Sequence, residues 1–148
     1  MASPRQQANR ARSAARRQLM KALYQWQLTG QPWQDIHQQF VADEDFGQAD
    51  AGYFREALMQ IATGAPTLDA ELAKHSEIAT GRLDPVEHGI LLLGLWELMH
   101  RPDVPYRVVI NESVELARRF GATDGYKFVN AVLDRASLVH RAPERGAA

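Results

Sequence analysis

The chain of 148 residues has the length of one domain, and its 45% of hydrophobic residues can build a substantial core without covalent cross-links. It contains no cysteine, which excludes disulfide bridges, zinc–thiolate centres and thiol nucleophiles. The net charge of −1 argues against a surface that is positive all over, as a stand-alone nucleic-acid binder often has. No secretory signal is evident, and the longest apolar run, Ile90 to Trp96, is too short to span a bilayer. We therefore expect a soluble, cytoplasmic protein with no membrane partner.

The charges are unevenly distributed along the chain. Residues 1–34 carry six basic residues and no acid, whereas residues 35–148 hold 11 basic and 18 acidic residues. The acids include a cluster in a predicted loop from Asp43 to Asp50. This separation permits a local basic patch, and it leaves an acidic remainder that suits a basic partner.

In chain order, we expect a flexible basic lead over residues 1–9, a single helical domain over residues 10–141 and a flexible tail over residues 142–148. Within the domain, apolar residues recur at helical spacing, and no segment alternates as a strand would. Gly64 and Pro66 are expected to interrupt the pattern. The predicted helices cover approximately residues 9–28, 32–41, 53–61, 68–81, 85–100, 105–121 and 124–140. The fold class is therefore all-α, with about seven helices in one compact bundle or two small ones.

The fifth predicted helix has the clearest start. Asp84 can cap it, Pro85 suits its first position, and Glu87 stands where a capping box places its acid. Apolar residues then occupy most faces from Ile90 to Leu98, which is typical of a central helix.

The first predicted helix has two different sides on a helical wheel. Its apolar side holds Ala15, Leu19, Ala22, Leu23 and Trp26. The opposite side holds Arg10, Arg17, Lys21 and Tyr24, while Arg12 and Arg16 lie toward the edge of the apolar stripe. Cations neutralise phosphates and a tyrosine ring can stack on an unpaired base, so this side indicates a surface for RNA. An ordinary solvated face is the alternative, although such faces normally mix both charge signs.

The last predicted helix begins with a lysine and aromatic rings. Lys127 lies near backbone N–H groups that can bind an anion. The spacing of Phe128 with Val132 and Ala136 favours a core position for that ring.

Nothing in the sequence indicates an active site. The five histidines show no metal-ligand spacing, and the chain lacks a phosphate-binding glycine loop and a nucleophile elbow. We interpret Glu112 and Glu115 as solvated carboxylates on one helix face. We therefore predict that the protein is not an enzyme and holds no cofactor or metal.

Several ordered blocks resemble a known family, the NusB family. The C-terminal blocks are Asp103 to Glu112, Glu115 to Ala117, Phe120 to Ala122, Lys127 to Asn130 and Val132 to Asp134. The N-terminal blocks are Ala22 to Trp26 and Tyr53 to Arg55. The similarity spans about residues 10–140, nearly the whole chain.

The resemblance implies a seven-helix fold of two small bundles and a role in transcription antitermination. In this family the protein binds boxA-type RNA of nascent ribosomal RNA as a heterodimer with ribosomal protein NusE. The pair joins an RNA polymerase complex with other Nus factors. Carried over residue by residue, the RNA contacts are Arg10, Arg12, Arg16, Arg17, Tyr24, Lys127 and Phe128. For Phe128, the resemblance thus favours RNA over the core.

The resemblance also implies a surface for the protein partner. Glu87 and Asp124 match positions on or near that surface. Two departures stand out: Gly81 replaces an expected acid, and Ala131 replaces a common glycine. Two other functions remain open, namely the N-terminal RNA-binding domain of a ribosomal RNA methyltransferase and a helical adaptor that forms homodimers.

Overall fold

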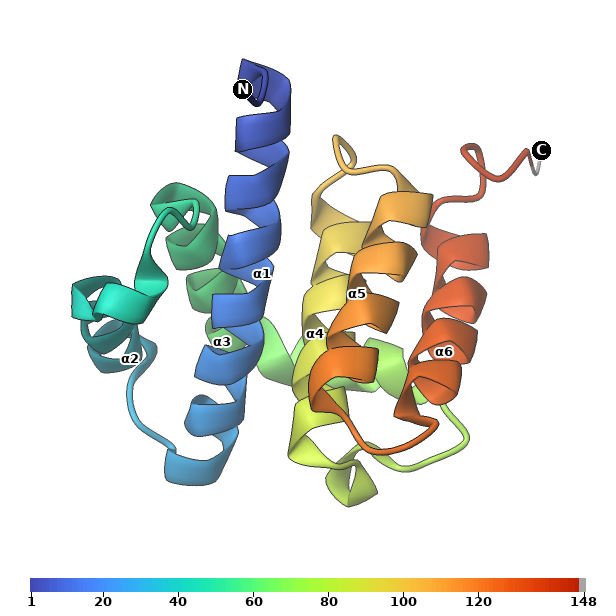
Figure 1. The fold of residues 1–148 in the computed structure, drawn as a ribbon. Coiled ribbons are helices and arrows are strands. Elements are labelled where there is room, and N and C mark those ends of the chain that lie inside the picture. The colour runs from blue at the N-terminus through green and yellow to red at the C-terminus, as the bar shows by residue number, and fades with distance from the viewer. Residues whose placement is uncertain (147–148) are drawn as a thin grey trace. The chain divides into compact units, whose positions relative to one another are not determined.

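The computed structural model describes residues 1–146, and the described residues form helices and loops without a strand (Figure 1). The α-helices are α1 (Pro4–Thr29), α2 (Trp33–Ala42), α3 (Ala51–Ala73), α4 (Pro85–His100), α5 (Tyr106–Phe120) and α6 (Gly125–His140). Two short 3-10 helices are η1 (Glu44–Phe46) and η2 (Thr80–Arg82). The predicted all-α class is confirmed. No described helix combines the length and apolar character that a membrane span requires.

The third and fourth predicted helices are a single helix, α3, so the described chain has six α-helices rather than seven. Pro66 lies inside α3, although an interior proline removes a hydrogen bond and costs about 3 kcal/mol. Ile61, Ala65 and Leu68 are buried on either side of it, at 0%, 8% and 3% exposure. Packing of this apolar side outweighs the local cost of the proline, which the sequence pattern did not weigh. The helix ends at Ala73, earlier than the predicted end near Gly81.

Helix α1 begins five residues earlier than the sequence pattern predicted. Ser3 and Gln6 form a capping box, and Pro4 occupies the first helical position. Gly30 ends the helix in the left-handed region, with φ of 67°, as a glycine at this position favours. Residues 4–9, predicted as a flexible lead, are therefore helical.

By its internal contacts the chain divides into two compact units, residues 1–63 and residues 64–148. In the first unit, α1 packs against α2 and η1. Four of the five residues predicted on the apolar side of α1 are fully buried, and Trp26 is half-buried. The ring of Phe54 lies at the centre, stacked on Phe40 at 5.9 Å and edge-on to Phe46 at 5.1 Å.

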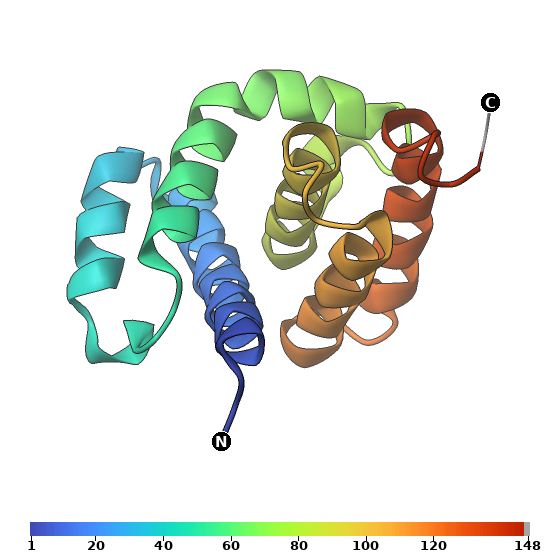
Figure 2. The same ribbon diagram turned by 90° about the horizontal axis from the view of Figure 1, so that it is seen from above.

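In the second unit, α4 packs against both α5 and α6, and the three helices lie side by side (Figure 2). The residues of α4 from Ile90 to Leu98 are at most 2% exposed, which confirms the predicted central helix. Asp84 caps it, since its Oδ1 accepts a hydrogen bond from the Val86 N–H at 2.8 Å. Gly94 permits the close approach of α6, because a β-carbon there would lie 2.7 Å from Leu133 Cδ1.

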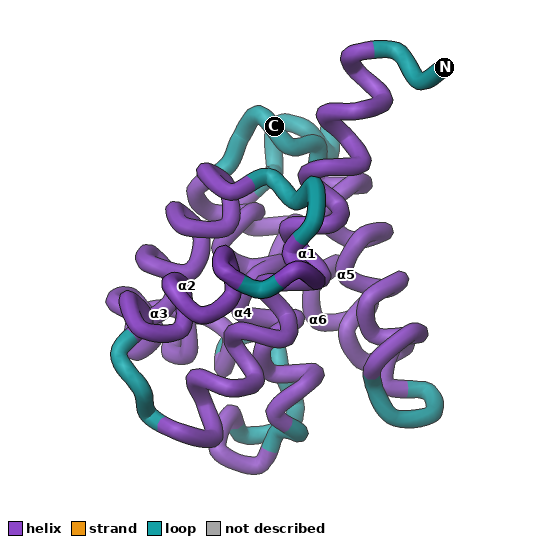
Figure 3. The backbone as a smooth tube through the Cα atoms, turned by 60° about the vertical axis from the view of Figure 1, so that its left-hand side comes forward, coloured by secondary structure: helices purple, strands orange, loops and turns teal. Residues whose placement is uncertain are grey.

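A buried arginine closes the C-terminal end of the second unit. The Arg141 side chain is 7% exposed and donates hydrogen bonds to four backbone carbonyls and one carboxylate. The acceptors are the carbonyls of Glu97, Leu98, Arg101 and Val104 and the Glu144 carboxylate. The predicted tail, residues 142–148, is thus held to the unit through Glu144. Residues 147–148 lie outside the described part. Figure 3 shows the C-terminal segment leaving α6 as a loop.

Candidate nucleic-acid interface

The exposed side of α1 borders a groove of about 570 Å³ in the first unit. Arg10 and Arg17 line it from α1, two helical turns apart, and the η1 loop lines it from the other side. The remaining lining residues are Gln7, Ala11, Ala14, Asp45, Phe46, Gly47 and Gln48. The same two arginines line an adjoining hollow of about 330 Å³ with Asn9 and Ser13. Two cations beside a concave surface can each meet a phosphate, while the groove holds the attached sugar or base.

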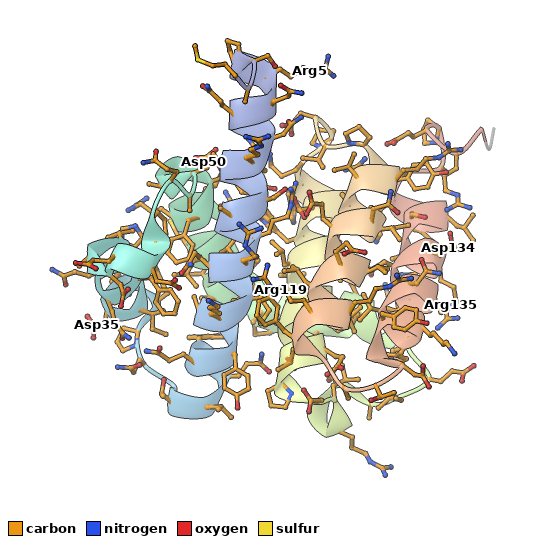
Figure 4. The ribbon with its side chains drawn as sticks, viewed as in Figure 1. Arg5, Asp35, Asp50, Arg119, Asp134 and Arg135 are labelled. Carbon is orange, nitrogen blue, oxygen red and sulfur yellow. The ribbon has the colours of Figure 1, made fainter. Side chains whose placement is uncertain are left out.

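Arg12 and Arg16 face the interior of the first unit. The Arg12 guanidinium carbon lies 3.9 Å from the centre of the Tyr53 ring, and its Nε lies 3.7 Å from Asp50 Oδ2. Arg16 is only 3% exposed, with its guanidinium carbon 5.8 Å from the same ring. Figure 4 labels Asp50, which precedes α3. Both arginines therefore fasten α1 to the start of α3 and offer little surface to RNA. Of the four predicted arginine contacts, Arg10 and Arg17 are the most accessible to RNA.

The acidic loop lies against the basic helix. Asp45 Oδ2 accepts from Lys21 Nζ at 3.3 Å and from Gln18 Nε2 at 3.4 Å, and these hydrogen bonds lower the pKa of Asp45. The Asp50 N–H donates to the Ala11 carbonyl at 2.9 Å. The sequence analysis missed this pairing, although a segment without acids followed by a cluster of acids was its signal. Lys21 thus shares its charge with Asp45 at the edge of the groove.

We expect Asp45→Asn to tighten RNA binding roughly fourfold at physiological salt. The change removes one negative charge from the groove and ends the ion pair of Lys21, and one added phosphate contact steepens the salt dependence by about 0.7. Fluorescence anisotropy with labelled RNA at several salt concentrations measures both effects. Asp35→Asn, on the exposed start of α2, is the matched control (Figure 4). Equal affinities for the two variants would show that Asp45 does not oppose RNA.

Tyr24 extends this side of α1 toward its C-terminal end. Its side chain is exposed, at 40%, and follows Lys21 by one helical turn. Arg10 and Tyr24 are 14 residues apart, or about 21 Å along the helix. Arg5 lies farther out at the N-terminal end (Figure 4). Arg10, Arg17, Lys21 and Tyr24 thus form one stripe on a single helix, and Arg12 and Arg16 lie outside it.

In the second unit, the predicted residues Lys127 and Phe128 lie in the first turn of α6. Lys127 is exposed, with its Nζ 3.5 Å from Asp124 Oδ1, and Phe128 is half-buried. Sequence reasoning missed two neighbours: Arg118 lies over the Tyr126 ring at 4.5 Å, and Arg119 lies over the Phe120 ring at 5.2 Å. The sequence signal was a pair of arginines ending one helix just before the aromatic start of the next. Cations and rings therefore gather in this unit too.

The predicted partner residues differ in their surroundings. Glu87 is 5% exposed, and instead of closing a capping box its Oε1 accepts from the Ala122 N–H at 2.9 Å. Its Oε2 is buried without a hydrogen-bond partner. Burial, together with the nearby Asp84 carboxylate, raises the pKa of Glu87. Asp124 is exposed and adopts a left-handed backbone with φ of 65°. Glu87 thus holds the α5–α6 loop, and its predicted contact with a partner stays a prediction.

Two glycines make room for the Glu87 carboxyl group. A β-carbon on Gly121 would lie 2.6 Å from Glu87 Oε1, and one on Gly125 would lie 2.3 Å from it. Gly121 would also meet the Ala117 carbonyl oxygen at 2.7 Å. The loop between α5 and α6 is therefore shaped around this acid.

Fold and site together define a small all-helical protein with a basic groove on its first helix. A sequence model of the NusB family matches residues 13–137, and the chain belongs to this family. The transcription antitermination protein NusB of Halorhodospira halophila is 49% identical over 137 residues, covering 91% of this chain and 88% of the relative. That of Pseudomonas savastanoi pv. phaseolicola is 48% identical, covering 84% and 75%. The resemblance seen in the sequence is confirmed.

Two solved structures share the fold. NusB of T. maritima superposes with a TM-score of 0.79 at 27% identity, over 99% of both chains. A chain from a crystal structure of antitermination factors NusB and NusE in complex with double-stranded RNA gives a TM-score of 0.79 at 26% identity. This match covers 90% of the present chain and 98% of the other. The described helices therefore follow the family architecture throughout.

Proposed function

We propose that this protein is a transcription antitermination factor that binds boxA-type RNA of nascent ribosomal RNA as a heterodimer with NusE. The observation that carries the proposal is the groove lined by Arg10 and Arg17 on a helix that has no acid. The curated relatives are antitermination proteins, and a chain of the same fold occurs in a complex with NusE and RNA. Within an RNA polymerase complex that includes other Nus factors, the heterodimer would act in the cytoplasm by binding, without chemistry.

The proposed RNA contacts divide by side-chain chemistry. Arg10, Arg17 and Lys21 take phosphates, and Tyr24 takes an unstacked base, worth about 1–3 kcal/mol. Lys127 and Phe128 add a cation and a ring from the second unit. Asp124, exposed beside Lys127, and the Glu87-held loop are the proposed surface for NusE.

The test is an anisotropy titration of boxA-type RNA with the full chain, with and without NusE. We expect weak binding by the chain alone, with a salt slope of about −2 for three phosphate contacts to a single strand, and tighter binding with NusE. A scrambled RNA should bind at least tenfold more weakly to the heterodimer. Equal affinity for the two RNAs would refute sequence-specific binding. Because the solved complex holds double-stranded RNA, a duplex competitor is included to compare the two forms.

The two other functions have different tests. The two relatives named above are antitermination proteins, which favours the binding role. Homodimer formation stays a prediction, and light scattering with and without RNA would reveal whether self-association competes with RNA.

A further inference from the structure

Three metal-ligating side chains meet in the second unit, and none of them belongs to the proposed RNA or partner residues. Glu71 lies on the last turn of α3, His75 two residues beyond that helix, and His140 at the last position of α6. Glu71 Oε1 is 2.8 Å from His140 Nε2 and 3.3 Å from His75 Nε2. All three donor atoms lie within 4.8 Å of one another. The two imidazoles thus converge on one oxygen of one carboxylate.

From this geometry we propose that Glu71, His75 and His140 bind one zinc ion, which fastens the end of α3 to the end of α6. Zinc takes imidazole nitrogens and carboxylate oxygens at about 2.0–2.2 Å in a tetrahedral arrangement, which places neighbouring ligand atoms about 3.3 Å apart. The distance between His75 Nε2 and Glu71 Oε1, 3.3 Å, equals this spacing. The distance between His140 Nε2 and Glu71 Oε1 is 2.8 Å, and all the ligand atoms lie within 4.8 Å of one another, so small side-chain movements of His140 and His75 complete the tetrahedral arrangement. Magnesium and calcium prefer oxygen ligands, so two imidazoles select a transition metal.

The degree of burial fits a site that a metal ion can enter. The side chains of His75, Glu71 and His140 are 9%, 14% and 19% exposed. The ligands are thus held in place by their surroundings but reach solvent. A water molecule can complete the tetrahedron from the exposed side.

The charges around the site favour an ionised carboxylate. Lys74 Nζ contacts the other oxygen, Oε2, at 2.9 Å, and its side chain is 69% exposed, so it leaves Oε1 available to the metal. Arg135 donates from Nε to the His75 carbonyl at 2.8 Å, which fixes the backbone of that ligand (Figure 4).

A second pair of a histidine and a carboxylate, His88 and Asp69, lacks a third ligand. His88 Nε2 lies 2.6 Å from Asp69 Oδ1, but no third donor joins them among the described residues. Three protein ligands from two helix ends distinguish the Glu71 cluster from such a pair. An ion pair of protonated histidines with Glu71 would give the same distances, so zinc binding itself must be measured.

The experiment is calorimetric titration of zinc chloride into the tag-free full chain, with His140→Gln compared with His100→Gln. Both histidines end a helix, but His100 is exposed at the end of α4 and outside the cluster. We expect one zinc per chain, and a melting temperature raised by about 5–10 °C at a hundredfold excess of zinc over Kd. His140→Gln should weaken zinc binding at least tenfold, whereas His100→Gln should bind as the unchanged protein does.

Cobalt provides a readout on the unchanged chain, in case a variant does not fold. Cobalt(II) in place of zinc should give the strong visible absorption of a tetrahedral site and broaden the NMR signals of His75 and His140 before those of the other histidines. The proposal is overturned if cobalt keeps the weak spectrum of the hydrated ion. It is equally overturned if His100 responds as strongly as His140, since zinc would then bind surface histidines at random.

Discussion

Replacing both Arg10 and Arg17 by glutamate is expected to weaken binding of boxA-type RNA about 10²-fold at physiological salt. The two arginines line the same groove, and the double reversal changes its charge by four units. The loss of two phosphate contacts, each worth about 0.7 in the salt dependence, accounts for roughly 15-fold near 0.15 M salt, and repulsion between the two glutamates and the phosphates supplies the rest. Anisotropy titrations of the heterodimer with NusE measure the loss, and a milder change to glutamine should flatten the salt slope by about 1.4.

The matched control for this experiment reverses two arginines elsewhere. Arg82 in η2 and Arg107 in α5 are both exposed, and neither lines the groove. Their double reversal changes the net charge of the chain by the same amount. If the control lowers affinity as strongly, only the overall charge matters and the groove is not the RNA site.

The second large effect concerns stability: Arg141→Met is expected to lower the free energy of unfolding by about 2–4 kcal/mol, because it leaves two buried carbonyls without a donor. Arg141 donates to the Leu98 carbonyl at 2.9 Å and to the Val104 carbonyl at 2.8 Å. The residue that would pair with Leu98 in a longer helix is Pro102, which has no N–H. The Glu97 and Arg101 carbonyls, which Arg141 also contacts, accept from backbone N–H groups as well. Methionine fills similar space but donates no hydrogen bond, so the Leu98 and Val104 carbonyls lose their donor, while the Glu144 carboxylate keeps the Tyr106 N–H. Urea unfolding followed by circular dichroism measures the change.

Lysine at position 141 separates the roles of charge and geometry. Lysine keeps the positive charge but lacks the planar guanidinium whose donors reach several carbonyls at once. The Arg141→Lys protein should therefore still be strongly destabilised. Arg82→Met, at an exposed position of the same unit, should change stability by less than about 0.5 kcal/mol. A loss below 1 kcal/mol for Arg141→Met would mean that water replaces the guanidinium without penalty.

Local patterns predicted most of the helices because their causes lie within a few residues. The apolar side of α1 and the start of α4 follow from side-chain period and capping, and both are confirmed. Pro66 was misread because its local preference is opposed by burial of Ile61, Ala65 and Leu68 on either side of it in α3. Tertiary packing also buries Arg16, whereas the helical wheel of α1 placed this residue only near the edge of the apolar stripe.

Contacts between distant segments could not be predicted from any short window. Asp45 reaches Lys21 across 24 residues, and Glu71 reaches His140 across 69. The histidines therefore showed no metal-ligand spacing in the sequence, although the fold brings two of them to one carboxylate. Glu87 was read as part of a capping box, but the loop at Ala122 supplies its partner from 35 residues away. The RNA and partner roles of the predicted residues stay predictions until the binding experiments are done.

The buried position of the Glu87 carboxyl group limits which residues related sequences can carry in the loop between α5 and α6. The three nearest atoms to a β-carbon at position 125 all belong to Glu87, so a shorter side chain at 87 makes alanine tolerable at 125. Positions 87 and 125 should therefore covary across homologues. Position 121 obeys a separate constraint, because the Ala117 carbonyl oxygen obstructs a β-carbon there whatever residue stands at 87.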